Sequence, residues 1–105
     1  MKTIYKYPFP IQDDVKIILP IDAVVLSIQQ QSPHDQFLQL WALTNPTTPE
    51  TKVYQFKVFG TGHPIPDNIM QTHKYVTTII THNGRAVWHI FIEREYQEVF
   101  PHDSK

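Results

Sequence analysis

The chain has 105 residues, of which 41% are hydrophobic, and its formal net charge is −1. This length and composition predict one folded domain, residues 1–105, and exclude a disordered chain. A near-neutral charge without a basic run argues against binding to duplex nucleic acid, and the absence of cysteine excludes disulfides and thiolate metal sites. Residues 1–10 lack the apolar run of a signal peptide or a membrane span, so we expect a cytoplasmic protein without a membrane partner.

Strand-like patterns, separated by proline-rich or turn-forming segments, follow one another along most of the chain. We expect seven strands, over Lys2–Tyr7, Val15–Leu19, Ala23–Gln31, Gln36–Thr44, Thr51–Phe59, His73–His82 and Arg85–Arg94. Pro8 and Pro20 are expected to end the first two. The pattern predicts an all-β fold, a compact small sandwich or partly open barrel of about seven short antiparallel strands with a C-terminal hairpin. We expect residues 95–105 to form a mobile tail.

The last hairpin carries the clearest local signal, because Asn83-Gly84 is typical of a two-residue type I′ turn. Such a turn fixes which residues lie opposite each other. The expected pairs are Ile80 with Val87, Thr78 with His89 and Val76 with Phe91 on one face, and Ile79 with Trp88, Thr77 with Ile90 and Tyr75 with Ile92 on the other. Both faces are largely apolar, so one of them needs a cover, such as the N-terminal strands, the tail, a partner or a second copy. A homo-oligomer is therefore expected.

The loop between the fifth and sixth predicted strands, Gly60-Thr61-Gly62-His63-Pro64-Ile65-Pro66, concentrates glycine and proline. Its backbone N–H groups can line an anion site, with His63 as a further donor. No helix follows the loop, as phosphate fingerprints require, so a rigid turn is the alternative interpretation. On the last strand, Arg85, Trp88 and His89 supply a cation, an aromatic ring and an imidazole. The candidate ligand-binding residues are Gly60, Thr61, Gly62, His63, Arg85, Trp88 and His89.

The six histidines do not follow the spacing of a metal site, since neither His-x-His nor His-x-x-x-His occurs. No serine lies in a nucleophile-elbow context, and the loop carboxylates form no recognisable pair. We therefore expect no metal, no cofactor and no enzymatic activity.

Five separated blocks carry a resemblance to a known family: Met1–Tyr7, Leu19-Pro20, Trp41–Leu43, Gly60–Pro66 and Val87–His89. Together they resemble a family of short, functionally uncharacterised phage and prophage accessory proteins. The resemblance implies a non-essential phage protein that acts in the cytoplasm of the infected bacterial host, and it brings no activity, cofactor or site residues with it.

This context favours a non-catalytic binding protein that counters host defence. Our first hypothesis is sequestration of a small phosphate-bearing nucleotide immune signal by the residues listed above. The alternatives are a protein-binding inhibitor of a bacterial defence complex, comparable to an anti-CRISPR protein and using the surplus hairpin face or an exposed edge strand, and a minor virion or assembly component.

Overall fold

The computed structural model describes residues 1–95 and consists almost entirely of strands. Its elements are β1 (Thr3–Phe9), β2 (Asp14–Pro20), β3 (Val24–Gln29), β4 (Leu38–Thr44), β5 (Thr51–Gly60), α1 (Ile69–Thr72), β6 (His73–Thr81), a 3₁₀ turn (His82–Gly84) and β7 (Ala86–Glu93). Every strand pair is antiparallel. The expected all-β class is therefore confirmed. The tail expected over residues 95–105 lies outside the described residues, apart from Glu95 itself.

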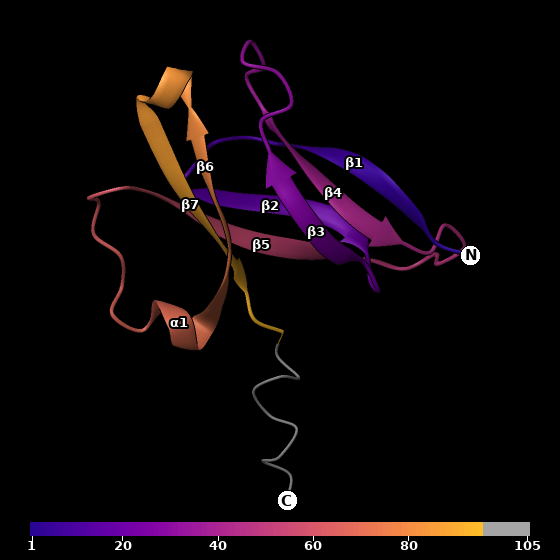
Figure 1. Cartoon of the computed structure of the whole chain (residues 1–105). Coiled ribbons are helices and arrows are strands. Elements are labelled where there is room, and N and C mark those ends of the chain that lie inside the picture. The colour runs from indigo at the N-terminus through magenta and orange to yellow at the C-terminus, as the bar shows by residue number, and fades with distance from the viewer. Residues whose placement is uncertain (96–105) are drawn as a thin grey trace, which may run out of the picture.

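The strands form two sheets, one of three strands in the order β1-β4-β3 and one of four strands in the order β2-β5-β7-β6. The β3–β4 hairpin belongs to the first sheet, and the β6–β7 hairpin closes the second. In Figure 1 the β6–β7 hairpin extends well beyond β2 and β5, and the β5–β6 connection makes a wide loop that ends in α1. Each sheet has two edges, formed by β1 and β3 in one and by β2 and β6 in the other.

The core lies between the two sheets, because apolar residues at alternate positions of each strand face the opposite sheet. Its buried members are Phe9, Val15, Ile17, Leu19, Ile28, Leu38, Leu40, Ala42, Tyr54, Phe56, Val58, Ile79 and Ile90. The rings of Phe9 on β1 and Phe56 on β5 meet edge to face, with centroids 5.1 Å apart. This contact joins the two sheets at the centre of the core.

Two local expectations were wrong. Strand β1 continues through Pro8 to Phe9 instead of ending before the proline. This is possible because β1 is an edge strand, where a residue without an N–H donor loses no ladder bond on its free side. Strand β2 likewise includes Pro20 at its end. The sequence also gave no sign of α1, whose four residues are too few to show a helical period.

The last hairpin turns at Asn83-Gly84 as predicted, but the strands end at Thr81 and Ala86, because His82 also has a positive φ and belongs to the 3₁₀ turn. The register is correct only near that turn. Asn83 and Gly84 have positive φ angles of 55° and 87°, and the Arg85 N–H donates to the His82 carbonyl at 3.1 Å. The expected pairs hold from Ile80–Val87 to Thr77–Ile90. A β-bulge at Val76 then shifts the register, so Tyr75 lies opposite Phe91 instead of Ile92.

The bulge also changes which residues of the hairpin lie on the inner face and which lie on the outer face. Ile79 and Ile90 enter the core, whereas Phe91 is buried on the outer face of the sheet, between the rings of Phe59 and Tyr75. Ile80, on the same outer face, stays 62% exposed. The surplus apolar face is thus covered in part by aromatic side chains of its own sheet.

Candidate functional site

The predicted glycine loop folds back on itself. The His63 ring lies against Gly60, where an added Cβ atom would come within 3.0 Å of the imidazole, and Gly62 has a φ of +88° that favours glycine. The N–H of Thr61 donates to the Val87 carbonyl at 3.2 Å, and that of His63 donates to the Gly60 carbonyl at 3.1 Å. Two of the donors expected to hold an anion are therefore already used within the protein.

A hollow of about 310 Å³ beside this loop is lined by both acidic and basic residues. Its lining includes Asp13 and Asp14 together with Lys57 and His63. The ammonium group of Lys57 forms an ion pair with Asp14. Carboxylates at this position repel an anion, so the geometry favours a rigid corner over a phosphate cradle.

Thr61 and His89, two of the predicted residues, do meet on the outer face of the four-stranded sheet. Thr61 Oγ1 lies 2.6 Å from Nε2 of His89, and Thr78 Oγ1 lies 2.9 Å from its Nδ1. Thr78 Oγ1 in turn lies 2.6 Å from the Tyr75 hydroxyl. The chain of hydrogen bonds crosses from the end of β5 over β7 to β6. Tyr75 was expected on the opposite face, because the bulge at Val76 leaves no signal in the sequence.

Trp88 and Arg85 lie apart from this chain. The Trp88 side chain turns to the inner face, where it packs against the core and its Nε1 donates to Thr81 Oγ1 at 2.9 Å. Arg85 is exposed and follows the hairpin turn. The seven predicted ligand-binding residues therefore do not line one pocket.

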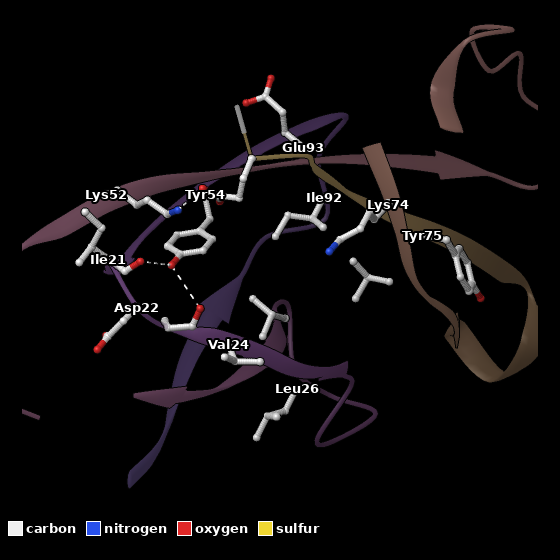
Figure 2. Close-up of a pocket in the computed structure, with 14 residues that line it drawn as sticks. Ile21, Asp22, Val24, Leu26, Lys52, Tyr54, Lys74, Tyr75, Ile92 and Glu93 are labelled. Atoms are coloured by element: carbon white, nitrogen blue, oxygen red, sulfur yellow. Dashed lines mark hydrogen bonds and ion pairs between the residues drawn. The ribbon is translucent and has the colours of Figure 1, made fainter. Parts of the chain in front are cut away.

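A groove of about 650 Å³ lies instead between the edge strands β3 and β6 (Figure 2). The residues that line it are Ile21, Asp22, Ala23, Val24, Val25, Leu26, Lys52, Tyr54, Lys74, Tyr75, Val76, Ile92, Glu93 and Glu95. In Figure 2, Val24 and Leu26 form one side, Lys74 extends toward the groove from β6, and the Tyr75 ring turns away. Apolar side chains therefore dominate the centre, and charged groups lie around it.

Both strands that border the groove carry a β-bulge there. The register of β3 shifts at Leu26 and that of β6 shifts at Val76, and both bulged residues line the groove. A bulge bends its strand and interrupts the regular ladder. The groove is thus shaped by two local irregularities that face each other across it.

Tyr54 closes one end of the groove. Its hydroxyl lies 2.9 Å from the Pro20 carbonyl, 3.2 Å from that of Ile21 and 3.3 Å from that of Ala23, so it holds the β2–β3 turn in place. Burial raises the pKa of Tyr54, and the nearby carboxylate of Glu95 raises it further. The phenol therefore stays protonated and donates its hydrogen bond.

A cation lies over the Tyr54 ring. The ammonium nitrogen of Lys52 is 4.8 Å from the ring centroid and forms an ion pair with Glu95. The Lys52 charge is thus balanced by a carboxylate and an aromatic face at the end of the groove.

Apolar surface continues from the groove over β3 to the outer face of the three-stranded sheet. Ile4, Leu43 and Val24 lie side by side across β1, β4 and β3. Ile4 and Val24 are about half exposed. The sequence places these residues on strands, but their alignment depends on sheet pairing between segments distant in the chain.

Among residues 1–95, no three histidine or carboxylate side chains come close enough together to hold a metal ion. No helix in the same part of the chain is long and apolar enough to cross a membrane.

The sequence model of one protein family, described as a domain of unknown function (DUF7352), matches residues 1–100. No curated protein and no solved structure matches the chain. The chain therefore belongs to this family, whose description assigns no activity.

Proposed function

We propose that this member of the family is a non-catalytic binding protein that captures an extended segment of another protein in the groove between β3 and β6. The proposal rests on the four sheet edges, which differ in how many charged residues and prolines they carry. Unpaired edges readily accept a further strand, and proteins usually protect them with charges or prolines. The two edges beside the groove have the least of this protection.

The protected edges are β1 and β2. Strand β1 carries Lys6 and Pro8, and β2 carries Asp14, Lys16 and Pro20. By contrast, β3 has the sequence Val-Val-Leu-Ser-Ile-Gln, without a charge or a proline. Strand β6 has Lys74 as its one lysine, and its last six residues, 76–81, are all β-branched. The groove is therefore bordered by the two edges most able to pair with an added strand.

An extended segment has two kinds of interaction to make in such a groove. Its backbone can pair with the free edge of β3, which supplies affinity without regard to sequence. Its apolar side chains can contact Leu26, Val76 and Ile92, which line the groove, and these contacts select for sequence. The row of Ile4, Leu43 and Val24, of which Ile4 and Val24 are about half exposed, extends the surface beyond the groove.

The resemblance to phage accessory proteins gives this proposal its setting. We propose that the partner is a protein of a bacterial defence system and that binding occludes it in the cytoplasm of the host. We also propose that the chain assembles with copies of itself, because part of the β6 edge is free of charge.

A matched pair of valines tests the binding proposal. Val24 on the groove and Val53 on the outer face of β5 are 50% and 49% exposed. Val24→Glu buries a carboxylate on binding, so we expect at least about tenfold weaker binding, equivalent to about 1.4 kcal/mol. Val53→Glu leaves binding unchanged.

The partner is first captured from bacterial lysate with tagged protein, then purified, and its Kd is measured by calorimetry with each variant. Equal losses from both substitutions, or none from either, would contradict the assignment of the groove. A stoichiometry far from one partner per chain would do the same.

A second candidate function is sequestration of a small phosphate-bearing signal in the same groove. Its volume of about 650 Å³ lies in the range of small-ligand sites, Lys52 lies over the Tyr54 ring, and Lys74 also lines the groove. A panel of cyclic nucleotides and nucleotide sugars, tested by thermal shift, separates the two functions. Only this second function predicts a rise in Tm with a nucleotide, and the rise is lost in Lys74→Gln.

A further inference from the structure

The C-terminal part of β6, residues 77–81, has a free edge distinct from the groove. Strand β6 is the last strand of its sheet, so within residues 1–95 its outer edge pairs with no further strand. The bulge at Val76 separates residues 77–81 from the groove-lining residues Lys74 and Tyr75. In Figure 1 this part of β6 lies toward the hairpin tip.

The sequence of this segment suits a regular strand. Residues 77–81 are Thr-Thr-Ile-Ile-Thr, five β-branched residues in succession and none of them charged. Such residues have the highest preference for strands, and a flat, uncharged edge of this kind pairs with other strands unless it is covered. The nearest charged residues on either side in the sequence are Lys74 and Arg85.

We propose that residues 77–81 pair with the same segment of a second copy, in an antiparallel two-fold arrangement centred on Ile79. The two four-stranded sheets then join into one continuous sheet through β6. In this register Thr78 lies opposite Ile80 of the partner subunit, and Thr77 lies opposite Thr81 of the partner subunit.

The second copy is the favoured occupant because the segment is compatible with itself. A two-fold axis brings each residue near its own copy, so a charged edge would repel itself, whereas this one has no charge. Pairing also covers part of Ile80, which is 62% exposed on the outer face in the single chain. The groove lies on the other side of the bulge and stays open, so the dimer does not depend on the function proposed for it.

Light scattering after size exclusion tests the dimer. We expect wild-type protein at about 100 µM to have close to twice the mass of one chain, since a dimer with a Kd of about 10 µM or below is mostly associated at this concentration. Ile80→Lys leaves the hydroxyl contacts of Thr78 intact and raises the dimer Kd at least about tenfold. Ile18→Lys is the matched control, because Ile18 is 65% exposed on the protected edge strand β2, and this variant stays dimeric.

A charge exchange tests the register. Thr78→Lys/Ile80→Lys places like charges opposite each other in the dimer, and so does Thr78→Glu/Ile80→Glu. We expect each double variant to be folded by circular dichroism and monomeric, and a 1:1 mixture to form a heterodimer. A monomeric wild type, an Ile18→Lys variant that dissociates as much as Ile80→Lys, or a mixture that stays monomeric would overturn the proposal.

Discussion

The four sheet edges of this protein fall into two pairs that are built differently. Strands β1 and β2 carry charged residues and prolines, whereas β3 and β6 have almost none and border the groove. Strand β1 also contributes Phe9 to the centre of the core, against Phe56 of the other sheet. In contrast, the pairing register of β3 and that of β6 each shift at a bulge.

The two pairs of edge strands therefore have different roles, one in stability and the other in binding. The protected strands help to hold the sheets together through fully buried side chains such as Phe9, Leu19 and Val15. A sandwich held in this way can leave another pair of edges open without unfolding. We therefore expect substitutions in the core to change stability, and substitutions at the exposed positions of β3 and β6 to change binding or assembly.

The largest expected effect on stability follows from Phe9→Ala. The ring is fully buried and packs edge to face on Phe56, so its removal leaves a cavity between the sheets. Large-to-small changes of this kind cost about 3–5 kcal/mol in the free energy of unfolding. Phe37→Ala is the control, because Phe37 is exposed before β4, and it should change stability by less than about 0.5 kcal/mol. Urea unfolding measures both, and similar values for the two variants would contradict the assigned core.

A smaller effect is expected from Tyr54→Phe at the end of the groove. The substitution keeps the ring but removes the hydroxyl that lies near three carbonyls of the β2–β3 turn. Loss of such a partly buried hydrogen bond costs about 1 kcal/mol. Tyr75→Phe removes an exposed hydroxyl that contacts Thr78 and should cost less than about 0.5 kcal/mol. If both variants unfold at the same urea concentration, Tyr54 does not hold the turn.

The smallest effect concerns pH. His73 is buried at the start of β6, and burial lowers its pKa below the ordinary 6.5. The charge of Lys57 lowers the pKa further, while Glu93 opposes the shift. The folded protein thus binds this proton less readily than the unfolded chain does. The resulting stability is present above pH 6.5 and is lost as the pH falls through the lowered pKa of the folded state.

We therefore expect the free energy of unfolding of the wild type to decline as the pH falls below about 6.5, and that of His73→Gln to decline less steeply. His34→Gln, a change in the exposed β3–β4 connection, should keep the slope of the wild type. Urea unfolding at each pH gives the slopes. A slope unchanged by His73→Gln would show that His73 does not contribute to it.

Most of the fold could be predicted from the sequence because its signals are local. Alternating apolar residues located all seven strands, and Asn83-Gly84 gave the correct turn and the nearby pairs. The strand through Pro8 was missed, since whether a proline is tolerated depends on whether the strand lies at an edge. The bulges at Leu26 and Val76 were missed for a similar reason, because they depend on pairing with a distant strand.

The candidate site was predicted only in part. Thr61 and His89 were both named, and they do share a hydrogen bond on the outer face. The groove could not be located, because Val24, Tyr54 and Lys74 come together only after the two sheets have formed. What the sequence did contain was the contrast in charge between the edge strands, although which strands form edges becomes clear only in the structure.

Photo-crosslinking in bacterial cells tests directly whether the groove between β3 and β6 binds a partner protein. A photo-reactive amino acid replaces Leu26 beside the groove or, in a separate variant, Ile18 on β2, two residues that are both exposed. We predict that the Leu26 variant forms an adduct with one partner protein and that the Ile18 variant forms none. An adduct of equal yield from Ile18, or the absence of any adduct from Leu26, would contradict the claim that the unprotected edges are the binding surface.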